Sequence, residues 1–225
     1  MDVIEAITTR KSIRAYKPDP IKKETIEEIL KIAVHAPSGT NAQPWEFTVI
    51  TGKVLETVKQ ANVELVNSKT PPNPDFFYFE NWPPESGYHK RKIELAKQIF
   101  QLVGIPREDI EKRRQWLERG FRFFDAPAAI IISEDRSIPE ANQLIDIGTI
   151  IQSICLAALN YGLGTCIEYQ GIMYPEVLRK FGGILESKRI LVSIAIGYPD
   201  WDFPANKLKS TRQPIEDITR WCGFE

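Results

Sequence analysis

The sequence predicts one globular domain of mixed α and β structure. Its 225 residues, of which 43% are hydrophobic and 26% charged, suffice for one large domain with a complete core. Helical patterns alternate along the chain with short β-branched runs bounded by Gly, Pro or charged residues. The sequence contains no internal repeat and no low-complexity tract. We therefore expect residues 1–225 to form a single domain.

Two amphipathic helices are expected first, at residues 2–8 and 23–34. In the second, apolar residues recur at spacings of three and four and share one helix face: Ile26, Ile29, Leu30 and Ala33. Four buried strands are expected at 46–51, 128–133, 164–169 and 189–197.

Residues 70–90 combine Pro, aromatic and acidic residues without a sustained period, which favours a loop or lid. Two charged helices are expected after it, near 90–102 and 106–122, so that 70–125 forms a lid or insertion. Its aromatic residues would either stack on an aromatic substrate or cover a dimer interface. They are Phe76, Phe77, Tyr78, Phe79, Trp82 and Tyr88.

The most apolar stretch is 144–164, and polar residues interrupt it too often for a membrane span: Asp146, Gln152, Ser153 and Asn160. It is instead expected to be a helix buried at the centre of the domain or in a subunit interface. The C-terminal residues 198–225 are rich in Pro and aromatic residues and poor in periodicity. They predict an arm that packs in extended form against another surface.

The formal net charge of −1 argues against nucleic acid or an anionic membrane as a partner, since such binders usually carry a basic excess. Three cysteines without C-x-x-C spacing and two histidines suggest neither a disulfide framework nor a metal site. A reducing cytoplasm fits best, and the N-terminal residues do not resemble an export signal.

The segment RKSIRAY, residues 10–16, is a candidate anion site. In an extended chain Arg10, Ser12 and Arg14 project from the same side, and four strand steps cover about 13 Å. Guanidinium groups and a hydroxyl suit a phosphate monoester, so Arg10 could hold the phosphate of a mononucleotide while Arg14 reaches its ring. The alternative is an ordinary solvated basic turn.

The segment APSGTNAQPW, beginning at Ala36, is a candidate site for a polar heteroaromatic ring. Pro37 and Gly39 shape a turn, and Ser38, Asn41 and Gln43 offer donors and acceptors beside it. The alternative is a common helix-to-strand connection in which these side chains satisfy their own backbone.

Five ordered motifs resemble the flavin-dependent nitroreductase family: TTRKSIRAY, APSGTNAQPWEF, ALNYGLGTCIEY, AIGYP and KSTRQPIED. The resemblance covers most of the chain outside roughly 65–125. It implies an α+β sandwich whose central mixed, mostly antiparallel sheet is flanked by helices. It also implies a homodimer that holds one FMN per subunit in two sites at the interface.

The resemblance also implies the cofactor-binding residues. Arg10, Lys11 and Ser12 match the segment that grips the FMN phosphate, and Lys209 and Arg212 match a late basic pair that closes on it. Arg14 matches a basic position near the ribityl chain and the pyrimidine edge. The turn that reaches the flavin from the other subunit is matched by Pro37, Ser38, Gly39 and Asn41.

Glu168 and Tyr169 match the strand end whose backbone amide bonds flavin N5, although relatives often have Gly where Tyr169 stands. An amide that reads the pyrimidine edge would come from Asn62 or Asn67, and spacing does not choose between them.

The function implied is that of an FMN-dependent oxidoreductase that transfers hydride from NADH or NADPH to a nitroaromatic or quinone by a ping-pong mechanism. Flavin N5 carries this chemistry, so no side chain is expected to be catalytic. Two alternatives stay open. One is a flavoenzyme of the same fold that performs reductive dehalogenation or flavin breakdown, and the other is a non-enzymatic phosphate-binding module.

Overall fold

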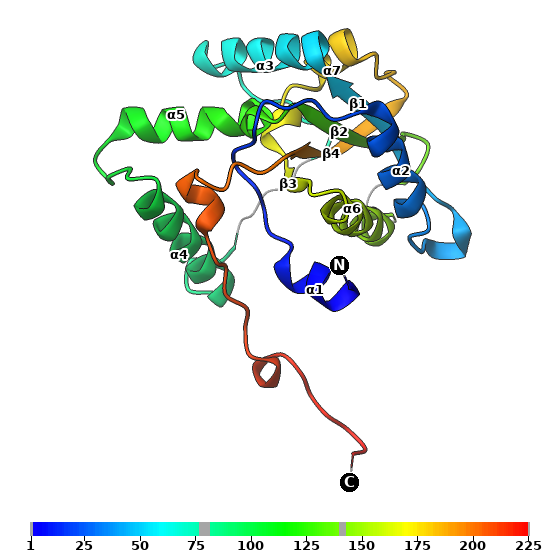
Figure 1. Ribbon diagram of the computed structural model, residues 1–225, viewed down its shortest axis with the longest axis vertical. Helices are drawn as coiled ribbons and strands as arrows, with labels where there is room; N and C mark the ends of the chain where they lie inside the picture. The colour runs from blue at the N-terminus through cyan, green and yellow to red at the C-terminus, as the bar shows by residue number, and fades with distance from the viewer. Residues whose placement is uncertain (1, 77–81, 140–142, 225) are drawn as a thin grey trace.

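The structure, a computed structural model, describes residues 2–76, 82–139 and 143–224. One four-stranded antiparallel sheet lies at its centre, with the strand order β1-β2-β4-β3 (Figure 1). Its strands are β1 (Glu46–Thr51), β2 (Ala128–Asp135), β3 (Gly164–Glu168) and β4 (Lys188–Gly197). All four predicted strands are confirmed, with ends that differ by at most two residues.

Seven α-helices occur in the described residues. They are α1 (Val3–Thr9), α2 (Lys23–Ala33), α3 (Gly52–Asn67), α4 (Gly87–Leu102), α5 (Ile110–Phe121), α6 (Leu144–Leu159) and α7 (Pro175–Gly182). The predicted helices 2–8 and 23–34 are confirmed, and the apolar stretch 144–164 is helical over Leu144–Leu159, since β3 begins at Gly164.

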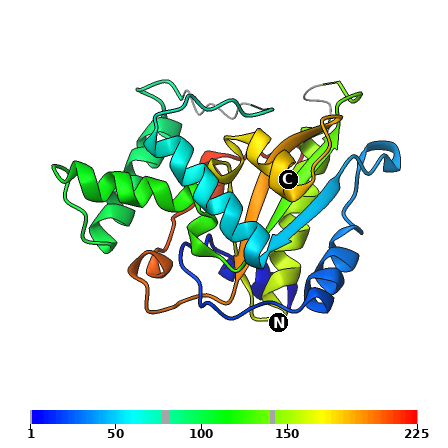
Figure 2. The same cartoon turned by 90° about the horizontal axis from the view of Figure 1, so that it is seen from above.

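The sheet separates two hydrophobic cores because side chains alternate between its faces along each strand. On one face, Ile130 and Ile132 of β2 pack with the apolar residues of α2 and α6. On the other face, Ala129 and Ile131 pack with those of α3 and α7. Figure 1 shows the resulting three layers, in which helices cover both faces of the sheet, and Figure 2 shows α3 and α7 lying over the sheet from above. The predicted α+β class is therefore confirmed.

A parallel contact extends the sheet at β3. Ser12 forms an isolated parallel bridge with Thr165, and Ile13 N donates to Thr165 O at 2.9 Å. A side chain at Gly164 would not allow this approach, since its Cβ would lie 2.5 Å from Cγ1 of Ile13. All pairings among the four strands are antiparallel, and the isolated parallel bridge of Ser12 lies at the β3 edge.

Two predicted boundaries in the 70–125 segment are wrong. Residues 87–90 are helical rather than loop, because Ser86 caps α4 by accepting a hydrogen bond from His89 N at 3.2 Å. Helix α5 begins at Ile110 rather than 106, because Asp109 caps it through Lys112 N at 3.0 Å. The expected lid aromatics Phe77, Tyr78 and Phe79 lie outside the described residues.

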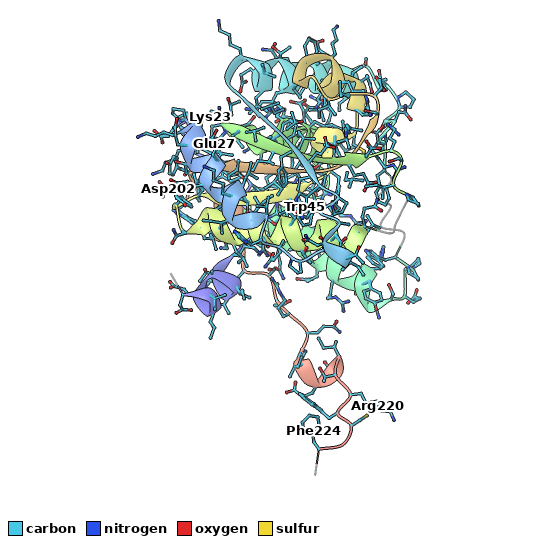
Figure 3. All side chains as sticks on the ribbon, turned by 90° about the vertical axis from the view of Figure 1, so that its right-hand side faces the viewer. Lys23, Glu27, Trp45, Asp202, Arg220 and Phe224 are labelled. Carbon is cyan, nitrogen blue, oxygen red and sulfur yellow. The ribbon has the colours of Figure 1, made fainter. Side chains whose placement is uncertain are left out.

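The C-terminal residues 209–224 leave the body of the subunit as an arm, as Figures 1 and 3 show. One 3-10 turn, Ile215–Asp217, interrupts the extended chain. Nearly all of these side chains are exposed, including Arg220 and Phe224 (Figure 3). That the C-terminal arm, predicted over 198–225, packs against another surface stays a prediction. Among the described helices, none combines the length and apolar character that a membrane crossing requires.

Candidate functional site

The end of α1 and the start of the arm enclose a hollow of about 670 Å³. We call it the cationic hollow, because four basic side chains line it and no acidic residue does: Arg10, Lys11, Lys209 and Arg212. Residues almost 200 positions apart in the sequence meet here, as the resemblance implied for the phosphate site.

The charges in the cationic hollow are held close together. Lys11 Nζ donates to the main-chain oxygen of Asn206 at 2.9 Å and lies 5.8 Å from the centre of the Trp201 ring. Burial and, to a smaller extent, the charge of Lys209 lower the pKa of Lys11. A group of cations that repel one another without a carboxylate favours a bound anion, so the hollow fits a phosphate.

The segment that follows the hollow is extended, as predicted. Ile13 and Ala15 are 2% and 5% exposed, while Ser12 and Arg14 lie on the opposite side and are partly exposed. Ser12 does not line the hollow. Its main chain is bridged to Thr165 of β3. Arg14 also lies outside the hollow, further along the segment. Its Nη1 donates to Ser12 O at 3.4 Å.

Glu168 ends β3 with its side chain turned into the core, where it is 5% exposed. Its carboxylate accepts from Gly171 N at 2.9 Å and from the hydroxyl of Ser193. Burial raises the pKa of this carboxyl to about 7. Tyr169 follows as the first residue beyond the strand and packs against both hydrophobic cores. A backbone amide at this strand end would therefore lie on rigid structure.

The 37–41 turn is fixed to the first turns of α6. Gly39 N donates to both carboxylate oxygens of Asp146, at 3.1 and 3.2 Å, and Thr149 Oγ1 donates to Pro37 O at 2.8 Å. Within the turn, Ser38 Oγ accepts from Gln43 N at 3.0 Å.

Asn41 has a positive φ of 60°, and its Oδ1 accepts from Gln43 Nε2 at 3.1 Å. Much of the polar capacity of the 37–41 turn is thus used locally. None of its residues lines the cationic hollow. Figures 1 and 2 both place this turn beyond α2, away from α1 and the arm.

Both candidate amides of α3 already have protein partners. The Nδ2 group of Asn62 donates to Phe121 O and Gly171 O, each at 3.1 Å. Asn67 Oδ1 accepts from Arg114 Nη1 at 2.7 Å. These contacts join α3 to α5 and to the residues after β3.

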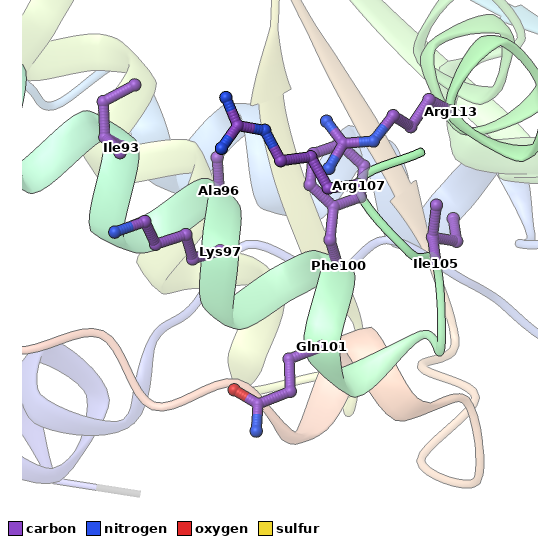
Figure 4. Close-up of a pocket in the computed structure, with 8 residues that line it drawn as sticks. All are labelled: Ile93, Ala96, Lys97, Phe100, Gln101, Ile105, Arg107 and Arg113. Carbon is purple, nitrogen blue, oxygen red and sulfur yellow. The ribbon is translucent and has the colours of Figure 1, made fainter. Parts of the chain in front are cut away.

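A second hollow, of about 470 Å³, lies between α4 and α5 in the 70–125 segment (Figure 4). Arg113 lies 4.3 Å from the centre of the Phe100 ring, and Lys97 and Arg107 are further cations of the lining. None of the predicted flavin residues lines it. In the described part of the chain, His, Cys, Asp and Glu form no group of three that could hold a metal ion.

Comparisons of the whole chain with known proteins identify its family. Residues 7–198 match the model of the Nitroreductase family. The chain belongs to the nitroreductase family. It is 33% identical to a nitrobenzene nitroreductase of Ectopseudomonas oleovorans and 32% identical to a chloronitrobenzene nitroreductase of Comamonas testosteroni. Each alignment covers 96% of this chain and 94% of the relative.

The fold resembles a crystal structure of the FMN- and NADPH-dependent nitroreductase NfnB of Sphigopyxis sp. strain HMH. The TM-score is 0.93 at 26% identity, and the match covers 100% of both chains. The predicted family, the enzyme class and the α+β nitroreductase fold are thereby confirmed.

One functional candidate was missed by sequence reasoning. Asn206 is 1% exposed, and its side chain joins the 10–16 segment to the chain before the arm. The sequence around it, FPANKLK, contains no motif that indicates this contact.

Proposed function

We propose that this nitroreductase-family protein is an FMN-dependent oxidoreductase that uses NAD(P)H to reduce nitroaromatic compounds, with quinones as further acceptors. The observation that carries the proposal is the cationic hollow, in which four basic side chains converge without an acidic one. FMN and NADPH are the molecules on which the NfnB enzyme of the same fold depends.

The residues present fit FMN better than FAD. A phosphate monoester would accept charge-assisted hydrogen bonds from Arg10 and Arg212, while Lys11 and Lys209 would act as point charges. The sequence has no G-x-G-x-x-G turn for a dinucleotide. When bound, FMN accepts hydride from NAD(P)H and passes electrons to the acceptor. The positive charge of Arg14 would stabilise the negative charge of the reduced ring.

We also propose a homodimer whose 37–41 turn completes the flavin site of the partner subunit. Apolar side chains are exposed on α1 and along the arm, where they are 53–78% exposed: Val3, Ile4, Ile7, Ile215, Ile218, Trp221 and Phe224. Ile145 of α6 is 82% exposed. Surfaces of this kind are typical of permanent interfaces. A partner subunit that covers these side chains would also explain why the arm is exposed in a single chain.

The acceptor is proposed from the names of two relatives, and the order of reaction from the family resemblance. Two relatives of more than 30% identity are named for nitrobenzene and chloronitrobenzene, so we expect an electron-poor nitroarene. In a ping-pong mechanism NAD(P)H leaves before the acceptor occupies the same face of the ring. The chain carries the exposed thiol of Cys222 and two buried thiols, all unpaired, which fits a reducing cytoplasm.

The proposal is tested on purified protein. Heat release followed by chromatography should yield FMN at about one per subunit, and addition of nitrobenzene should accelerate NADPH oxidation. FAD, or no flavin, would contradict the cofactor. Bound FMN without turnover of any nitroarene or quinone would instead favour another flavin chemistry on this fold.

A further inference from the structure

Asn206 connects two parts of the chain that the proposed FMN site requires. It lies in the 3-10 turn Pro204–Lys207, which precedes the arm residues of the cationic hollow. Its Oδ1 accepts from Arg14 N at 2.7 Å, and its Nδ2 donates to Ala15 O at 2.8 Å and to Asp200 O at 2.7 Å. Its main-chain oxygen accepts from Lys11 Nζ at 2.9 Å. One buried residue therefore fixes the 10–16 segment beside the start of the arm.

Arg119 of α5 holds the same segment from the other side. Its Nη2 donates to Arg14 O at 3.0 Å, its Nη1 lies 3.1 Å from Asp125 Oδ2, and its guanidinium lies 4.8 Å from the centre of the Phe203 ring. The main-chain N–H and C=O of Arg14 are thus both bound by side chains, one from the 70–125 segment and one from the chain before the arm.

We propose that Asn206 and Arg119 are positioning residues of the flavin site, which act by fixing the main chain of Arg14. This inference rests on the proposed function. With both backbone groups of Arg14 held, the guanidinium extends from a fixed main-chain position, which limits where it can lie relative to a bound flavin ring. Through the hydrogen bond of Arg119 to Arg14 O, helix α5 of the 70–125 segment contributes to the flavin environment.

The geometry favours this role over a purely packing one. Arg119 places a cation where burial lowers its pKa, and it directs one nitrogen to a main-chain oxygen and another to a carboxylate. A lysine at this position would keep the charge but could not reach both partners in the same planar arrangement. Charge and positioning can therefore be separated experimentally.

The test measures FMN affinity and the midpoint potential of bound FMN in Arg119→Lys and Asn206→Leu. We expect Asn206→Leu to bind FMN at least tenfold more weakly, because the 10–16 segment is then no longer fixed beside the arm and the cations of the hollow can separate. We expect Arg119→Lys to have a lower midpoint potential, because the charge of Arg14 is no longer held in place. Arg113→Lys is the matched control on the same helix, since Arg113 contacts Phe100 and Pro106 instead.

A double-mutant cycle distinguishes positioning from a direct effect. In an Arg14→Ala background, Arg119→Lys should cause no further change in potential. The proposal would be overturned if Arg119→Lys shifted the midpoint potential equally in the wild-type and Arg14→Ala backgrounds. It would also be overturned if folded Arg119→Lys and Asn206→Leu both kept the FMN affinity and midpoint potential of the wild type. If Asn206→Leu fails to fold, Arg119→Lys and the cycle decide the outcome. A wild-type protein that binds no FMN would overturn both the proposed function and this inference. If the wild-type protein binds FMN but the variants keep its affinity and midpoint potential, only this inference is overturned.

Discussion

The cationic hollow and the 37–41 turn, the two main parts of the proposed flavin site, differ in how complete they are within one chain. The hollow joins residues from both ends of the chain and holds its charges close together. The turn is equally well fixed, through Asp146 and Thr149 of α6, yet it lies apart from the hollow. One chain thus carries a cationic hollow and a well-fixed 37–41 turn that do not meet. In the proposed homodimer, each would serve a different copy of the flavin.

The largest effect is expected in the cationic hollow. Arg10→Ala combined with Arg212→Ala should weaken FMN binding by about 3 to 6 kcal/mol, because each removes a charge-assisted contact worth about 1.5 to 3 kcal/mol. Fluorescence titration of apo-protein with FMN measures the loss. Arg220→Ala is the control, since Arg220 also lies on the arm but does not line the hollow (Figure 3). Equal losses in the control and the double variant would show that the arm, and not the hollow, carries the effect.

Glu168, at the end of β3, is expected to make the free energy of unfolding depend on pH by about 3 kcal/mol. All of its described partners belong to the same chain. The pKa of Glu168 is raised from 4.5 to about 7 in the folded protein, so the native state keeps a proton that the unfolded chain releases. Stability should therefore be highest below pH 4.5 with respect to this group, and fall by about 3 kcal/mol as pH rises to about 7.

Urea unfolding of apo-protein at several pH values measures this contribution. Glu168→Gln resembles the protonated acid and should remove the decrease, leaving the variant more stable than wild type at pH 8. A wild-type protein whose stability does not fall relative to Glu168→Gln over this range would contradict the assignment.

The 37–41 turn allows a sharper test of whether it serves its own subunit. A Cβ at Gly39 would have Asp146 Oδ2 as its nearest neighbour, at 3.9 Å, so one chain has room for a side chain there. Gly39→Leu should therefore leave the stability of the apo-protein nearly unchanged. If the turn lies against the partner's flavin, the same variant should weaken FMN binding by about 1 to 3 kcal/mol through overpacking. Unchanged FMN affinity would place the turn away from any flavin.

The smallest effect distinguishes the two ends of the 10–14 segment. Arg14→Ala should retain most of the FMN affinity but lower the midpoint potential by about 20 mV, corresponding to about 1 kcal/mol for two electrons. Arg10→Ala should do the reverse and mainly weaken binding. Spectroelectrochemistry and FMN titration of both variants measure these quantities. A lowered potential in Arg10→Ala with none in Arg14→Ala would mean that the segment runs the opposite way along the cofactor.

The parts of the fold that follow from local periodicity could be predicted from the sequence. The β-branched strands and the amphipathic α2 contain their pattern within a few residues, and each lies where it was expected. Short α7 was missed, although Pro175 begins it and Gly183, with a φ of 72°, ends it. Eight residues carry too little periodicity to distinguish a helix from a turn.

Site residues that lie within a recognised motif could be predicted from the sequence. Residues whose position depends on contacts between distant parts of the chain could not. Arg10 and Lys209 meet in the hollow as the resemblance implied. Ser12, which the resemblance assigns to the phosphate, does not line the hollow, because the bridge to Thr165 of β3 fixes its main chain there. Its role at the phosphate stays a prediction. Asn206 could not be found at all, since its partners Arg14 and Ala15 lie more than 190 positions away in the sequence.

In the proposed dimer, each flavin site combines the cationic hollow of one subunit with the 37–41 turn of the other. Two differently tagged chains should be co-expressed, one with Arg10→Ala and Arg212→Ala and the other with Gly39→Leu, and the doubly tagged heterodimer isolated. A shared site predicts about one FMN per heterodimer with wild-type affinity, because one site then combines two intact halves. Each homodimer would have two weakened sites. FMN affinity in the heterodimer no better than in either homodimer would contradict the claim, since every site would then be built within a single chain.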